Sequence, residues 1–206
     1  IDGDGDLDVI SSSASDNRIA WYAQTGEFDF GDTPAPYFTT SLDNGARHLA
    51  TGPTLGANRD RDAGGVNSAN ADGDDTTGAT PDDEDGVTFG TIMVGQLGAT
   101  VTVNVQNAPS GAKLDAWIDW NGDGSWGGAG EQVFTSLNVV AGANIVTFDV
   151  PGSALARETY ARFRLSTFGA LGIVGPAADG EVEDYAVTVS NPGAASGVFG
   201  TQNTIT

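Results

Sequence analysis

Residues 100–119 read TVTVNVQNAPSGAKLDAWID, and this stretch decides the fold. Its first seven positions alternate polar and apolar side chains with a period of two, which is the pattern of a half-buried β-strand. Asn, Pro and Gly within NAPSG (residues 107–111) mark a turn. Residues 114–119 (LDAWID) then alternate again. The stretch therefore predicts two strands separated by a turn.

The same pattern recurs along the rest of the C-terminal half, and no segment shows sustained helical periodicity. Glycine- or proline-containing turns separate most of the runs. Several short strands at such spacing predict an all-β fold, an antiparallel β-sandwich of Greek-key or jelly-roll-like type. An N-terminal β-hairpin and long calcium-bound loops are expected to accompany it. The further predicted strands, hairpin strands first, are Leu7–Ile10, Arg18–Tyr22, Gln132–Val140, Asn144–Val150, Tyr160–Ser166 and Val182–Ser190.

The composition favours cations as part of the fold. The chain has 28 Asp and Glu against 8 Lys and Arg, a formal net charge of −20, and such a surface repels itself unless it is neutralised. The shortage of Lys and Arg argues against nucleic acid as a partner. The chain has no cysteine, which excludes disulfides and thiolate metal sites, and no apolar run has the length of a membrane span. Bound calcium is the expected cofactor, and a merely solvated acidic surface is the alternative.

The best candidate calcium loop is DWNGDGSW, residues 119–126. Oxygen side chains at loop positions one, three and five can wrap one cation, and the glycine at position six permits the sharp turn. Position seven offers a backbone carbonyl, and a carboxylate at position thirteen closes the sphere. A plain Asn-Gly/Asp-Gly turn is the alternative. The candidate ligands, in chain order, are Asp119, Asn121, Asp123, Ser125 and Glu131.

Two further acidic segments resemble calcium loops less completely. DGDGDLD at the N-terminus fills positions three, five and nine of such a loop, and its first position would precede residue 1, so the chain is expected to be a segment of a longer protein. ADGDD, in the acidic stretch 60–85, resembles a calcium turn. At the N-terminal segment the expected calcium is weakly bound or has its sphere completed by water, and for ADGDD a solvated acidic loop is the alternative. The candidate ligands are Asp2, Asp4, Asp8, Asp72 and Asp74.

Other residues have competing functional and structural interpretations. Trp120 and Trp126 flank the best loop and form either an exposed sugar-stacking platform or a hydrophobic lid. Arg162 and Arg164 share one strand face and are expected to form ion pairs with the acids of residues 179–184. The alternative is that some of those acids coordinate a cation. The single histidine is expected to pack or cap. Because no nucleophile elbow or HExxH helix is present, we expect no enzyme activity.

Two families resemble the chain. Residues 1–26, with DGDGDLDVISSS and DNRIAWYAQTG, resemble the end of a VCBS/FG-GAP-type repeat. Residues 28–190, with LDAWIDWNGDGSW, YARFRLS and DGEVEDYAVTV, resemble the GEVED domain of bacterial secreted and surface proteins. The domain boundaries expected are a truncated repeat at 1–26, a GEVED-like sandwich at 27–190 and a linker or the start of the next module at 191–206.

The resemblance implies a secreted accessory module at the cell surface, without an established activity of its own. We therefore expect a calcium-stabilised structural or adhesion module of a large bacterial surface or secreted protein. A carbohydrate-binding module and a self-assembling filament or matrix subunit are the alternatives. The corresponding partners are calcium ions, polysaccharide, and neighbouring modules or copies of the chain itself.

Overall fold

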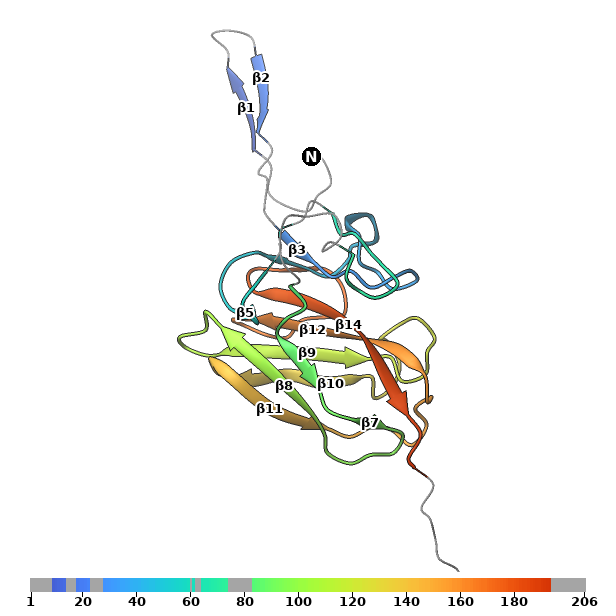
Figure 1. Ribbon diagram of the computed structural model, residues 1–206. Helices are drawn as coiled ribbons and strands as arrows, with labels where there is room; N and C mark the ends of the chain where they lie inside the picture. The colour runs from blue at the N-terminus through green and yellow to red at the C-terminus, as the bar shows by residue number, and fades with distance from the viewer. Residues whose placement is uncertain are drawn as a thin grey trace, which may run out of the picture.

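The computed structural model describes residues 9–13, 18–22, 28–59, 61, 64–73 and 83–193 (Figure 1). Within these ranges the fold is all-β, with one short 3-10 helix, η1 (Ser41–Asp43), and no α-helix. No helical segment in the described part is long and apolar enough to cross a membrane. The prediction of an all-β fold is confirmed.

Sheet I is the larger layer of a β-sandwich. Its five strands run in the order β10-β9-β12-β14-β7, and all neighbours are antiparallel except β14 and β7. Successive side chains of a strand point to opposite faces of the sheet, and one face of sheet I contacts the main core. The alternation of polar and apolar residues therefore predicts the long strands. The strands are β7 (Ile92–Met93), β9 (Ala112–Ile118), β10 (Gln132–Val139), β12 (Glu158–Ser166) and β14 (Glu181–Ser190).

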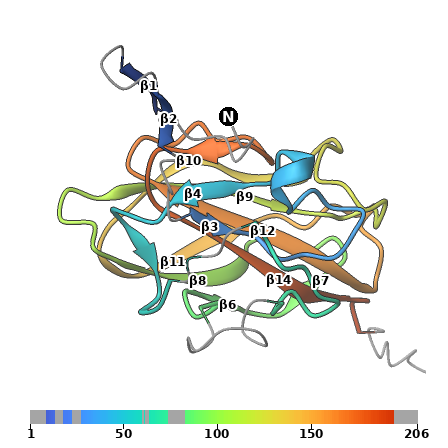
Figure 2. The same cartoon turned by 90° about the horizontal axis from the view of Figure 1, so that it is seen from above.

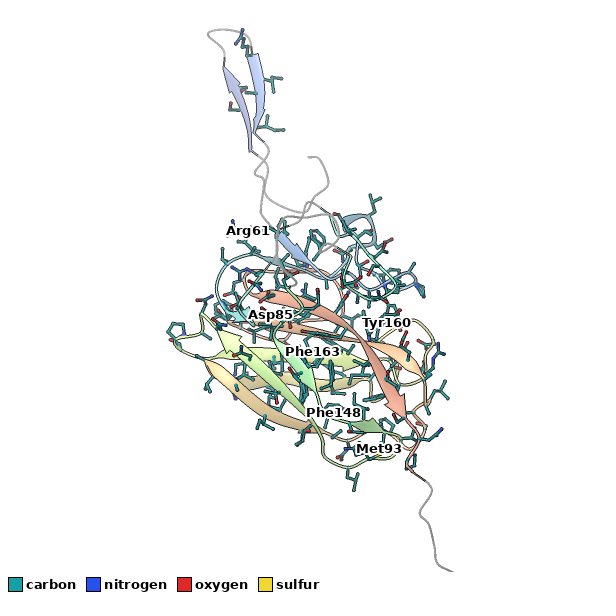
Figure 3. The ribbon with its side chains drawn as sticks, in the orientation of Figure 1. Arg61, Asp85, Met93, Phe148, Tyr160 and Phe163 are labelled. Carbon is teal, nitrogen blue, oxygen red and sulfur yellow. The ribbon has the colours of Figure 1, made fainter. Side chains whose placement is uncertain are left out.

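Sheet II packs against sheet I and encloses the main core. It has the order β11-β8-β5, and β6 also pairs with β8. Phe148 from sheet II and Phe163 from sheet I, both labelled in Figure 3, lie in this core with Val101, Val103 and Leu114. The strands of sheet II are β5 (Thr54–Leu55), β6 (Val87–Phe89), β8 (Ala99–Gln106) and β11 (Gly142–Phe148).

A third layer covers the outer face of sheet I. Strands β3 (Phe28–Phe30), β4 (Arg47–Leu49) and β13 (Pro176–Ala177) form a small sheet in the order β13-β4-β3, and in Figure 2 β3 and β4 lie over β9, β12 and β14. This layer converts a face that would be solvent-exposed in a two-layer sandwich into a second interior. The charged side chains on that face are therefore buried.

The N-terminal hairpin is made of β1 (Val9–Ser13) and β2 (Arg18–Tyr22), which pair with each other over five residue pairs. Among the described strands they have no other pairing partner, and Figure 1 shows them apart from the sandwich. The predicted hairpin is therefore present. The assignment of residues 1–26 to a VCBS/FG-GAP-type repeat, and the boundaries at 26/27 and 190/191, stay predictions.

Candidate metal centre

The loop after β9 is built around one buried carboxylate. Asp119 is fully buried: its Oδ1 accepts a hydrogen bond from Gly122 N (2.6 Å), and its Oδ2 accepts from Gly124 N (3.0 Å) and from the Tyr37 hydroxyl (2.5 Å). Gly124 has φ +82°, and a Cβ there would lie 2.3 Å from the Pro36 side chain. Only glycine therefore fits the position that the sequence pattern assigns to the turn.

The exposed rim of the loop is held by consecutive side chain–backbone hydrogen bonds. Asn121 Oδ1 accepts from Asp123 N (2.8 Å), and Asp123 Oδ1 accepts from Ser125 N (3.0 Å). Asn121 Nδ2 also donates to Asp123 Oδ2 (3.0 Å). These turns fix the two oxygen-bearing side chains at loop positions three and five beside each other.

Glu131 returns to the same loop from the start of β10. It is 1 % exposed; its Oε2 accepts from Gly128 N (2.6 Å), whereas its Oε1 is buried and accepts no hydrogen bond from the described residues. Burial, together with the charges of Asp119 and Asp123, raises the pKa of Glu131 above its ordinary value. The structure therefore brings together the predicted residues Asp119, Asn121, Asp123 and Glu131, with one buried oxygen still able to coordinate.

The acids that begin β14 each contact a different segment. Asp184 and Arg162 are opposite each other in the sheet and form a buried ion pair, and Asp184 Oδ2 also accepts from Thr33 N (3.1 Å). Glu183 accepts from Gly86 N (2.9 Å) and from the Tyr185 hydroxyl (2.8 Å). Burial, together with nearby acids of the segment before β6, raises the pKa of the Glu183 carboxyl well above its ordinary value.

A second carboxylate cluster lies at the first acid of this run. Asp29 in β3, Asp83 before β6 and Glu181 in β14 are 1 %, 4 % and 0 % exposed, and one carboxylate oxygen of each lies within 4.8 Å of the other two. Among the described residues this is the one group of three carboxylates that is so close. Asp119, Asp123 and Glu131 are therefore further apart than these three. The cluster has the donor set of a hard cation.

Part of the chain matches the sequence model of a known family. Residues 113–188, which include the loop and most of β14, match the sequence model of the GEVED domain. The matched segment is similar to the GEVED domain. This is a small β domain found in extracellular proteins, and Gly180–Asp184 spell its motif in this chain. No curated protein and no solved structure matches the chain.

The fold buries both arginines of β12, and the predicted pairing is correct for one of them. Arg162 pairs with Asp184. Arg164 instead donates to His48 Nε2 (3.0 Å) and to backbone carbonyls, including that of Gly172 (2.6 Å). Burial and the neighbouring Arg162 lower the pKa of Arg164 to about 9, so it stays charged at neutral pH. Carbonyl oxygens, rather than a second acid, therefore solvate this charge.

Of the two interpretations of Trp120 and Trp126, the sugar-stacking platform is wrong, because each side chain is only 4 % exposed. Trp120 packs near Phe148 and donates from Nε1 to Gly130 O (3.1 Å). Trp126 lies 4.4 Å from the Tyr37 ring centroid and under the Arg162 guanidinium. Trp120 belongs to the main core between the sheets, whereas Trp126 is covered by the segments around Tyr37 and Ile173. Neither ring has a free face for stacking, so the hydrophobic interpretation describes both residues.

Ser125 lies within the loop after β9, and Asp72 lies in another segment. Ser125 contributes a hydroxyl that accepts from Gly127 N (3.1 Å). Asp72 lies in a local turn, where it accepts from Ser68 Oγ (2.6 Å). Asp2, Asp4, Asp8 and Asp74 lie outside the described residues.

The sequence pattern did not identify Asp29 and Asp83 as candidate ligands, and it favoured an ion pair for Glu181. The alternation within EVEDYAVTVS (residues 181–190) places Glu181 and Glu183 on the same strand face as Val187 and Val189. Acidic residues on an otherwise apolar strand face indicate buried carboxylates, and this was the signal in the sequence that could have identified the cluster. Their partners, however, are distant in the chain, so the pattern alone does not identify them.

Proposed function

We propose that the chain is a non-catalytic structural module of an extracellular protein and that calcium bound in the 119–131 loop stabilises it. The observation that carries this proposal is Glu131, a buried carboxylate whose Oε1 accepts no hydrogen bond from the described residues and whose pKa is raised by burial and by the charges of Asp119 and Asp123. A buried charge in that position is costly unless something compensates it. A bound cation supplies the compensation.

Calcium suits this loop better than other metals. All the candidate side chains offer oxygen, which calcium takes in groups of six to eight from carboxylates, amides and carbonyls. The chain has no cysteine and one histidine, so the softer metals lack their preferred ligands. A net charge of −20 also favours divalent cations, because each bound ion reduces the self-repulsion of the folded chain.

The absence of a catalytic role is supported by the position of His48. Its ring is fully buried. Nε2 accepts from Arg164 Nε (3.0 Å), so Nδ1 carries the proton and donates to Asp179 O (2.8 Å). Both ring nitrogens are thus used within the fold, and neither is available to move a proton for a substrate. A GEVED domain found in extracellular proteins and built this way suits a structural or adhesive role on a cell surface.

The test is thermal unfolding of the whole chain in calcium and in excess chelator. If calcium binds only the folded form, free calcium at 100 times its Kd adds about 2.7 kcal/mol to the free energy of unfolding. We expect Asp123→Asn to lose much of this gain, and Glu158→Gln, which neutralises an exposed acid, to retain it. A wild-type melting temperature that is equal in calcium and in chelator contradicts the proposal.

A further inference from the structure

The geometry points to a second cation site, formed by Asp29, Asp83 and Glu181, at which one calcium ion fastens β3 and the segment before β6 to the first acid of the GEVED motif. It extends the proposed function and does not depend on the 119–131 loop. Its three ligands come from three segments that are far apart in the sequence, two of them outside the matched residues 113–188.

The spacing of the oxygens is that of one coordination sphere. Calcium binds oxygen at 2.3–2.6 Å, so two ligands of one ion lie at most about 5 Å apart. One oxygen each of Asp29, Asp83 and Glu181 lies within 4.8 Å of the others. The side chains therefore need no large rearrangement to bind one ion.

An independent observation is the hydrogen bonding of Glu181. One of its oxygens, Oε2, accepts a hydrogen bond from Leu55 N. The other, Oε1, is buried and accepts none from the described residues, in a side chain that is 0 % exposed. A buried carboxylate oxygen in this state lacks the compensation that such groups normally have. One oxygen each of Asp29 and Asp83 lies within 4.8 Å of an oxygen of Glu181, so a bound cation would supply the missing partner.

The local charges favour the same conclusion. Three buried carboxylates cannot all ionise side by side without a compensating positive charge. Arg59 is the arginine whose charge acts on Glu181, but its guanidinium donates to backbone carbonyls, including those of Ala50 (2.8 Å) and Gly180 (3.2 Å). Hydrogen bonds to carbonyls leave the charge of Arg59 in place, so Arg59 compensates the carboxylates in part. Further positive charge from a bound ion would complete the compensation.

The burial of the cluster selects calcium over magnesium. Magnesium dehydrates reluctantly and usually keeps several waters, whereas calcium accepts many protein oxygens in irregular geometry. Asp29, Asp83 and Glu181 are each at most 4 % exposed, which leaves little access for retained water. The single histidine is engaged by Arg164 and Asp179, so nitrogen ligation is excluded here as well.

Such an ion connects the layers of the protein. Glu181 begins β14 of sheet I and bonds to the backbone of β5 in sheet II, and Asp29 Oδ2 accepts from Val182 N (2.6 Å) beside it. Asp83 adds the segment that leads into β6. Calcium at this point joins both sheets and the outer layer at one end of the sandwich.

The experiment counts calcium bound to the whole chain by equilibrium dialysis and compares melting in calcium and in chelator. We expect Asp83→Asn and Glu181→Gln each to lose about one ion per chain. In chelator both variants should melt above the wild type, because like-charge repulsion is removed. In calcium the order should reverse. Glu158→Gln, the same change at an exposed position, should alter neither the ion count nor the order.

The outcomes separate this inference from the proposed function. If Asp123→Asn loses an ion while folded Asp83→Asn and Glu181→Gln keep the full count, the second site is refuted and the loop site stands. If the reverse is found, the loop site is refuted and the second site stands. If the cluster variants melt above the wild type by equal amounts in calcium and in chelator, the carboxylates share protons and the inference is overturned. Asp29→Asn replaces any variant that does not fold.

Discussion

Arg162 and Asp184 form a two-point ion pair in the interior, with Nε–Oδ1 at 2.7 Å and Nη2–Oδ2 at 2.6 Å, and neither side chain is exposed. The guanidinium also stacks on the Trp126 ring and donates to Phe38 O and Ile173 O. The pair therefore connects the GEVED motif in sheet I to the layer that covers it. Two such charges are stable inside a protein only because every donor and acceptor is matched.

Removing one partner of this ion pair should lower the stability of the fold strongly. We expect Asp184→Ala to lower the free energy of unfolding by about 3–5 kcal/mol, because Arg162 remains buried without its counter-charge. Urea unfolding followed by tryptophan fluorescence measures the change. Asp43→Ala, at an exposed position in η1, is the control and should change stability by less than about 1 kcal/mol. A similar effect of both substitutions contradicts the role assigned to the pair.

Gly180, the first residue of the motif, should not tolerate a side chain. Its φ is +100°, and a Cβ would lie 1.8 Å from Leu165 O. We expect Gly180→Ala to cost about 3 kcal/mol or more, because backbone strain adds to a clash that the neighbouring strand cannot relieve. Gly130→Ala is the matched control: it also has positive φ (+81°), but nothing lies within 4 Å of its Cβ position, so about 1 kcal/mol is expected. Equal losses in urea unfolding contradict the clash.

His48 should make the protein less stable in mild acid. Burial, followed by the charge of Arg164, holds the pKa of His48 well below 6.5. Below pH 6.5 the unfolded chain therefore binds a proton that the folded chain does not, and the free energy of unfolding falls as the pH falls.

The contribution of His48 to the pH dependence of stability is obtained by comparing the wild type with His48→Gln. Glu131, Glu181 and Glu183 have raised pKa values and act in the opposite sense, since they stabilise the fold as the pH falls. We expect wild type to lose about 2 kcal/mol more than His48→Gln between about pH 6.5 and 5, measured by urea unfolding in chelator. Parallel pH profiles of the two proteins contradict a neutral buried His48.

Trp126 should matter for stability and not for binding to polysaccharide. We expect Trp126→Phe to lower the free energy of unfolding by about 1–2 kcal/mol, through loss of the hydrogen bond to Tyr160 O and of part of its stack on Arg162. Retention on polysaccharide columns should stay unchanged. Phe38→Ala, an exposed aromatic on the same side of the loop (55 % exposed), is the control. Retention lost in folded Trp126→Phe alone contradicts this structural role.

The folding unit should be longer than the matched segment. Residues 113–188 lack β8, β5 and β6, so the core face of β9 and β12, with Leu114 and Phe163, loses all of its covering sheet except β11. We expect a fragment of residues 113–188 to show no cooperative thermal transition and residues 27–193 to show one, because burial of that face supplies most of the stability. Circular dichroism during heating distinguishes the two results, and a cooperative transition in the shorter fragment contradicts this boundary.

The sequence by itself determined the features that depend on residues close together in the chain. Strict alternation in residues 100–106 specifies a strand with one buried face, and it holds wherever that strand packs. The spacing of Asp119, Asn121 and Asp123 around glycines specifies a tight oxygen-rich loop, because the residues involved are near neighbours. The structure shows both features at the predicted positions.

Only the tertiary structure decided which face of sheet I is covered and which acids meet. Trp126 and Arg162 are buried because the segment around Tyr37 and Ile173 closes over them, and nothing in their own strand or loop encodes that cover. Asp29, Asp83 and Glu181 meet because strand register and layer order bring three distant segments to one point. Periodicity reports the face of a single strand, whereas a contact between layers depends on long-range packing of the whole chain.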